Sequence, residues 1–217
     1  MTTNNIENVN IVPNEDILDL AASSKEREFV ELGTRAELEV GTNIAEVLTG
    51  FPYIGSLFKL GLLARDYIGW RFCRKIAYFL SPGQNIPAQE KEKFLSSLGP
   101  KERKQIADYI THYLLTAEDD EKAQVLGYLY CERVKGYLDN TTFLRLCHAV
   151  NKIFLPDLRA LPDYLTKTED TDFEVNSFIN YGLIDNELGG VWKDGPSCEL
   201  NELGKTLYDV LHKHQWL

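Results

Sequence analysis

The sequence predicts a mainly α protein, in which a multi-helix bundle precedes a C-terminal α+β module with a small β-hairpin. Apolar residues recur at helical spacing through most of the chain, and short breaks rich in Gly, Pro or Asp separate these segments. Glycine-rich breaks around short apolar runs after residue 181 predict the hairpin. We therefore divide the chain into a flexible arm over 1–13, a helical domain over 14–155 and a module over 156–217.

The composition is that of an ordinary globular protein, with 44% hydrophobic and 26% charged residues. A net charge of −10 disfavours general nucleic-acid affinity, because phosphate contacts need a basic surface. The N-terminal residues lack the pattern of a secretory signal, and no uncharged apolar run is long enough for a conventional membrane span. None of the four cysteines forms a CxxC pair, so we expect reduced, buried thiols.

Two acidic helical segments follow the arm. Asn14 is a capping residue for a helix that ends near Ala22, and a second helical pattern runs over 24–40. The second pattern carries an acidic face, made of Glu26, Glu28, Glu31, Glu37 and Glu39. We expect this face to cover the basic stretch that comes next.

The segment 51–80 contrasts with the rest of the chain. It contains eight aromatic residues, five basic residues and one acid, which gives it a charge of +4 in an acidic protein. Its helical pattern is apolar almost all round, which is typical of a helix at the centre of a bundle, of one that contacts a membrane, or of one in a partner's groove. The candidate membrane- or partner-binding residues are Lys59, Trp70, Arg71, Arg74 and Lys75.

Residues 87–155 read as four helices joined by short loops. Asp119 and Asp139 stand where N-caps are needed, and Gly136 stands at a C-cap position. In the second of these helices, over 101–117, the apolar stripe that we expect to face inward is Ile106, Tyr109, Ile110, Tyr113 and Leu114.

The C-terminal module is expected to contain a short helix near 158–165, another over 173–181, a hairpin turn at Gly189-Gly190 and a final helix over 202–214. Its stretch FINYGLIDNELGGVWKDGPSCELNELGKTLYDVL, over 178–211, resembles the back half of a winged-helix domain. In that family the last helix often starts with Leu-Thr-x-x-Gly, and here Asn201 replaces the Thr. The resemblance implies a winged-helix-like fold, which in known proteins contacts DNA or other proteins.

The predicted module offers few residues that could bind DNA. The helix that would enter the major groove carries Asp172 and Glu174 and no basic residue. Only Asn176, Asn180 and, in the wing, Lys193 could contact DNA. We therefore expect the module to serve packing or protein contact.

No sequence motif indicates catalysis. The chain has no nucleotide-binding glycine loop, no zinc-protease helix and no serine nucleophile elbow. Asp119-Asp120-Glu121 fits a helix cap better than a cation site, and Cys147-His148 lacks an orienting third group. The four histidines, His112, His148, His212 and His214, read as isolated helical residues. We expect no catalytic residue, metal or cofactor.

The overall layout also resembles uncharacterised bacterial helical proteins, some of which are associated with mobile elements or phage defence. The sequence thus predicts a non-enzymatic interaction protein that binds a protein partner or an anionic membrane surface, the latter through 51–80. The expected location is cytoplasmic, including the periphery of the inner membrane. The alternative is a winged-helix DNA-binding transcriptional regulator.

Overall fold

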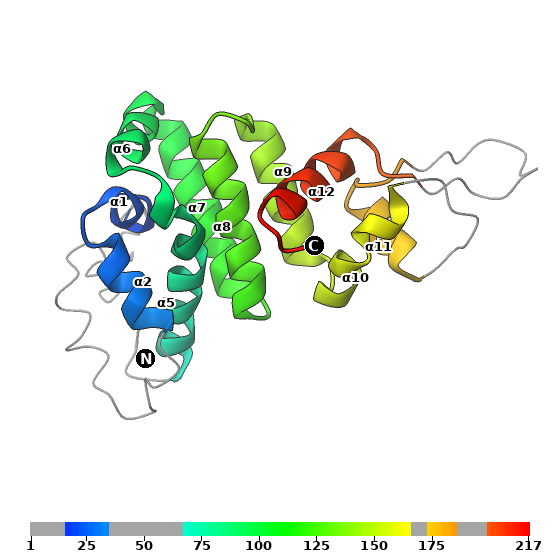
Figure 1. The fold of residues 1–217 in the computed structure, drawn as a ribbon, viewed down its shortest axis with the longest axis horizontal. Coiled ribbons are helices and arrows are strands. Elements are labelled where there is room, and N and C mark those ends of the chain that lie inside the picture. Colours follow the sequence, from blue (N-terminus) through cyan, green and yellow to red (C-terminus); the bar gives the residue numbers. More distant parts are fainter. Residues whose placement is uncertain (1–15, 35–66, 166–172, 186–198) are drawn as a thin grey trace, which may run out of the picture.

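The chain is mainly α, as predicted. A computed structural model describes residues 16–34, 67–165, 173–185 and 199–217. These residues form ten α-helices and two 3-10 helices (Figure 1). In chain order the elements are α1 (Asp16–Ala22), α2 (Glu26–Thr34), α5 (Tyr67–Leu80), η2 (Ser81–Asn85), α6 (Ala88–Ser97), α7 (Pro100–Thr116), α8 (Asp120–Val134), α9 (Asn140–Lys152), α10 (Leu155–Arg159), η3 (Leu161–Tyr164), α11 (Phe173–Asn180) and α12 (Glu202–Lys213).

Local signals set the ends of the bundle helices. The Asp119 carboxylate accepts a hydrogen bond from the Lys122 amide at the start of α8, and Asp139 accepts from the Thr141 and Thr142 amides at the start of α9. Gly136 follows α8 with a φ of 80°, a left-handed conformation that favours glycine. The three predicted caps are therefore confirmed. Within the described ranges, no group of three or more His, Cys, Asp or Glu side chains lies close enough to hold a metal ion.

Helix α5 lies in the interior of the bundle, between α2 and α8 (Figure 1). Phe72, Ile76 and Phe79 are buried in the core that these helices share. The described half of the apolar basic segment is therefore a core helix, whereas residues 51–66 lie outside the described part. In the part of the chain that the structure describes, no helix combines the length and the hydropathy needed to cross a bilayer.

Glycines allow α5 to approach its two neighbours closely. A Cβ on Gly33 of α2 would lie 2.4 Å from the Ala77 Cβ, and a Cβ on Gly127 of α8 would lie 2.2 Å from the Phe79 carbonyl oxygen. Both distances are too short for real atoms, so a side chain at either position would push the helices apart. The close packing around α5 thus depends on Gly33 and Gly127, which have no Cβ atom.

Helix α2 packs on α5 as expected, and its printed ion pairs are made with residues outside α5. The buried residues Phe29 and Val30, together with Gly33, make its inward face. Its acid Glu26 instead pairs with Lys91 of α6 in the protein interior. Helix α2 therefore covers α5 through an apolar face, and its buried acid Glu26 pairs with α6. The acids Glu37 and Glu39 of the predicted acidic face lie outside the described residues.

The C-terminal elements pack on the far side of α8 and α9, at the opposite end of the molecule from α1 and α2 (Figure 1). Within the described ranges, the β structure is limited to one antiparallel bridge between Ile184 and Leu200. The turn of the predicted hairpin, at Gly189-Gly190, falls outside those ranges. Gly204 of α12 lies against this bridge, because its Cβ would be 2.4 Å from the Leu183 carbonyl oxygen.

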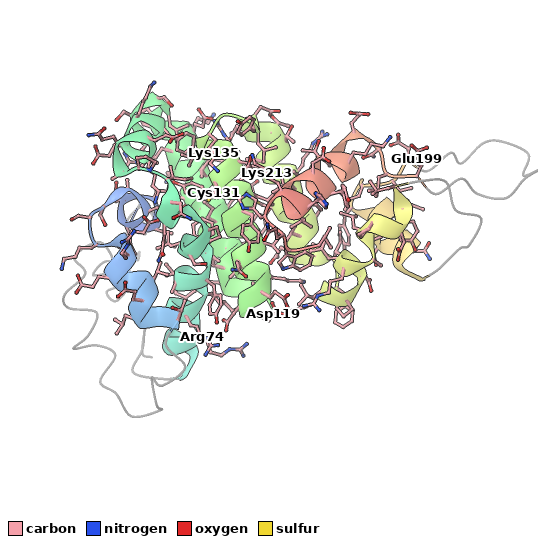
Figure 2. All side chains as sticks on the ribbon, in the orientation of Figure 1. Arg74, Asp119, Cys131, Lys135, Glu199 and Lys213 are labelled. Carbon is pink, nitrogen blue, oxygen red and sulfur yellow. The ribbon has the colours of Figure 1, made fainter. Side chains whose placement is uncertain are left out.

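A buried carboxylate connects α12 to the bundle. The Glu132 side chain is 3% exposed and accepts hydrogen bonds from Lys213 Nζ at 2.7 Å and His214 Nε2 at 3.0 Å. Lys135 adds a longer ion pair of 3.6 Å, and Figure 2 shows Lys135 and Lys213 together near the end of α8. Burial alone would raise the pKa of the Glu132 carboxyl, but the bonds from Lys213 and His214 lower it. The ionised Glu132 carboxylate thus attaches Lys213 and His214, at the end of α12, to α8.

We expect Glu132→Gln to weaken this connection in a pH-dependent way. A lowered pKa means that the Glu132 contribution is present above its ordinary value of 4.5 and is lost as the pH falls through the folded value. The variant should lose about 2 kcal/mol of unfolding free energy at pH 7, and the difference should shrink below about pH 4.5. Urea unfolding at several pH values measures the loss of unfolding free energy at pH 7 and its decrease at low pH.

Glu199→Gln is the matched control for this prediction. Glu199 pairs with Lys205 at 3.0 Å, with more than a third of each side chain exposed, so its loss should change stability by less than about 1 kcal/mol (Figure 2). A pH-independent difference between Glu132→Gln and the parent protein would contradict the assigned charge.

Candidate binding groove

The three described basic residues of the predicted membrane- or partner-binding set, Arg71, Arg74 and Lys75, bind other parts of the protein itself. Arg71 donates to the Glu118 carbonyl at 3.1 Å, and the buried Lys75 donates to the Ala117 carbonyl at 2.5 Å. Arg74 forms an ion pair with Asp120 at 2.5 Å, and Figure 2 shows Arg74 near Asp119 at the same end of the bundle.

These contacts join α5 to the connection between α7 and α8. Carbonyls at the end of a helix attract cations, which explains the choice of partners. Burial is the main cause that lowers the pKa of Lys75, and the nearby Arg71 adds to it. The three cations therefore act first as structural contacts of the bundle.

The other predicted site residues are not brought together. Trp70 lies in α5, and its side chain is outside the described part, as are all of Lys59 and Lys193. Asn176 and Asn180 are both exposed on α11. Of the two, Asn180 lines a cavity.

That cavity is an open groove of about 500 Å³ between the bundle and the C-terminal elements. Its volume lies in the range of ordinary ligand sites. Residues from α7, α9, the end of α11 and the start of α12 line it: Tyr109, Tyr113, Leu144, Arg145, His148, Asn180, Tyr181, Gly182 and Leu203. We call this cavity the aromatic groove.

A row of rings crosses the aromatic groove. Tyr109 and Tyr113 lie one turn apart on α7, with ring centroids 5.8 Å apart, and His148 of α9 lies 6.3 Å from Tyr113. Tyr181 continues the row at 6.2 Å from His148, in an edge-to-face arrangement. Tyr113 is buried, and burial raises its pKa to about 12, so its hydroxyl stays protonated at neutral pH. Tyr109 belongs to the apolar stripe that the sequence predicted for this helix, but it lies at the edge of the core and is 41% exposed.

Two polar side chains of the groove, those of Arg145 and Asn180, lack partners among the described residues. Within the described residues, Arg145 and Asn180 form no side-chain hydrogen bond or ion pair. Most other arginines of the described part do have a carboxylate partner, as in the pairs Arg103–Asp19, Arg133–Glu102 and Arg159–Glu121. The guanidinium of Arg145 and the amide of Asn180 are therefore free to bind a ligand.

The far wall of the aromatic groove is fixed by the end of α11. The Gly182 amide donates to the Ile179 carbonyl and the Leu183 amide donates to the Phe178 carbonyl, a pattern that closes a helix. Gly182 has a φ of 72°, which a residue with a side chain adopts only with strain. This turn sets the positions of Tyr181 and Asn180.

Asn201 joins this wall to α12. Its side-chain oxygen caps the helix by accepting from the Leu203 and Gly204 amides, and its amide nitrogen donates to the Gly182 carbonyl at 3.0 Å and to Asp185 at 2.9 Å. In the sequence Asn201 stood out only as a departure from the family phrase. Its preference for N-cap positions was the signal for this role.

Cys147 and His148, which are adjacent in sequence, do not meet in the groove. Cys147 points into the core, where burial raises the pKa of its thiol, whereas the neighbouring His148 is exposed in the groove. The lining residues include no carboxylate, thiol or serine among the part of the chain that the structure describes. Stacking, hydrogen bonding and ion pairing are what this arrangement can offer a ligand.

Comparison of the chain with protein-family models, with curated proteins and with solved structures finds no match. The aromatic groove is therefore interpreted from its own geometry.

Proposed function

We propose that the protein is a non-enzymatic interaction protein that binds a segment of a protein partner in the aromatic groove. The observation that carries the proposal is an open cavity of about 500 Å³ that is lined by aromatic rings and, within the described residues, by the unpaired polar side chains of Arg145 and Asn180. Tyrosine and arginine are the residue types that most often dominate binding energy at protein interfaces. Grooves between packed helices are also a common place for peptide segments to bind.

The proposal favours the groove over a membrane surface for a simple reason. Arg71, Arg74 and Lys75 already bind the connection between α7 and α8. Releasing them to bind lipid headgroups would leave the Asp120 carboxylate and two carbonyls without these donors. The groove residues can bind a partner without breaking any internal contact of this kind.

We also propose that residues 156–217 form a winged-helix-like module that serves as a wall of the groove. The order of α11, the Ile184–Leu200 bridge and α12 supports this proposal. Asn180, one of the residues that would contact DNA, instead lines the groove. This placement favours protein contact over DNA binding for the module.

Selection from a displayed library of random linear peptides tests the proposal. Enriched peptides should bind the full chain with micromolar affinity, and Tyr109→Ala should weaken them by about tenfold or more. Tyr109 is partly exposed, so its truncation should leave the fold intact. Isothermal titration calorimetry measures the affinities.

Tyr137→Ala is the matched control, because Tyr137 is a 72% exposed tyrosine that does not line the groove. It should leave peptide binding unchanged. The proposal fails if no peptide is enriched, or if Tyr109→Ala binds the enriched peptides as well as the parent does. Salt-sensitive binding of duplex DNA that Asn176→Ala abolishes would instead support the transcriptional regulator.

A further inference from the structure

We infer that the partner segment is an acidic peptide that inserts an aromatic side chain into the aromatic groove and places a carboxylate on Arg145. The inference rests on the proposed function and specifies the chemistry of its ligand. Three features of the described residues carry it: the unpaired guanidinium, the charge of α9, and the row of rings.

The first feature is the guanidinium of Arg145, which forms no hydrogen bond or ion pair within the described ranges. Arginine presents a planar set of donors that matches a carboxylate in a two-bond geometry. Exposed arginines elsewhere in the protein show this preference, since Arg159 lies 2.5 Å from Glu121. At the groove, a carboxylate from a ligand can fill the corresponding place.

The second feature is the charge of the helix that carries Arg145. Helix α9 contains no acidic residue, and Arg145, His148 and Lys152 are exposed along one stripe of it. The acids nearest in sequence to the lining residues, Asp108 and Glu202, do not line the groove. Among the described residues that line the groove, Arg145 is the charged side chain and none is acidic, which favours an acidic ligand although the whole chain carries −10.

The third feature is the row of aromatic rings that lines the groove. Tyr109 and His148 each contact the buried Tyr113 at tilted angles, and Tyr181 contacts His148 edge to face. An added aromatic side chain can continue such packing at a typical gain of about 1 kcal/mol beyond the buried area. The Asn180 amide supplies one donor group and one acceptor at the rim, which suits the backbone of an extended peptide.

Charge reversal at Arg145 provides the test. Peptides selected on the parent protein should share an aromatic residue with Asp or Glu close to it in sequence. Arg145→Glu should weaken those peptides by about tenfold to a hundredfold, and selection on this variant should enrich Lys or Arg beside the aromatic residue. Arg145 is exposed and forms no internal pair, so circular dichroism should show an unchanged fold.

Lys93→Glu is the control for the change in total charge. Lys93 is exposed on α6, which contributes nothing to the lining of the groove, so this variant should bind like the parent. Groove-dependent peptides without acidic residues, or equal binding by Arg145→Glu, would overturn the inference and leave the proposed function standing. Absence of any groove-dependent peptide would overturn both. Binding of a labelled single-stranded oligothymidylate that Tyr109→Ala abolishes would overturn the identity of the ligand as a peptide.

Discussion

Substitution of Gly127 by alanine should lower the free energy of unfolding by about 3 kcal/mol. The new Cβ would lie 2.2 Å from the Phe79 carbonyl oxygen and 3.0 Å from its carbon. Since these are backbone atoms, no side-chain rotation relieves the overlap, and α5 and α8 must separate. Equilibrium urea unfolding followed by circular dichroism measures the loss.

Helix propensity sharpens this prediction. Alanine is favoured over glycine in a helix interior by about 1 kcal/mol. The helix propensity alone would therefore stabilise the variant, and a measured loss of stability must come from the overlap with α5. The control is Gly99→Ala, because no atom lies within 4 Å of a Cβ at Gly99 and its φ is −66°. This change should cost less than about 1 kcal/mol. A Gly127→Ala protein as stable as the parent would show that the two helices do not approach this closely.

The second large effect is expected from Lys91→Met. Lys91 Nζ forms an ion pair with Glu26, and their side chains are only 2% and 11% exposed. Removal of the ammonium leaves a carboxylate in the interior without its partner, which typically costs about 3–5 kcal/mol. The pair links α2 to α6, so the N-terminal helices should detach first. Hydrogen exchange of α1 and α2 amides would reveal this order.

The pH dependence distinguishes the lost charge from lost packing. Burial raises the pKa of Glu26 even though Lys91 opposes the shift, so loss of Lys91 should raise that pKa further. A raised pKa makes its contribution to stability decline as the pH rises above the ordinary value of 4.5. The Lys91→Met protein should therefore be closer to the parent at pH 5 than at pH 7.

The Glu26→Gln/Lys91→Met double variant completes this experiment. Without the carboxylate, much of the loss at pH 7 should disappear, and a double-mutant cycle gives the coupling between the two residues. If the single Lys91→Met loss is the same at both pH values and the double variant recovers nothing, the contribution of Lys91 comes from its aliphatic chain and not from its charge.

Local sequence signals located most of the described helices. The exception is the helix predicted near 158–165, which is instead α10 over Leu155–Arg159 followed by the 3-10 helix η3, because Pro156 fits the first turn of a helix and does not end one. Asp119, Asp139 and Gly136 act within four residues of their own positions, so their roles can be read without knowing the rest of the fold. The pattern over 101–117 predicted α7 for the same reason. It did not separate Tyr113, which is buried, from Tyr109, which is exposed, because both lie on one side of the helix.

The pattern of charged residues in the sequence did not show which groups the charged side chains bind. Arg71 and Lys75 were candidates for an outside surface, yet their acceptors are carbonyls more than forty residues away along the chain. Lys122, next to a predicted cap, is fully buried, with its ammonium 3.1 Å from Glu118. A list of charged residues gives no information about which of them meet.

The helical class of this protein and most ends of its described helices follow from contacts within a few residues, so the sequence predicts them. The candidate site depends on the tertiary structure. The rings of Tyr109, His148 and Tyr181 come from three segments and form one row because α7, α9 and the end of α11 pack together. Gly182 and Asn201 then fix the far wall. Such a site depends on how helices pack across long sequence distances, which a local pattern does not encode.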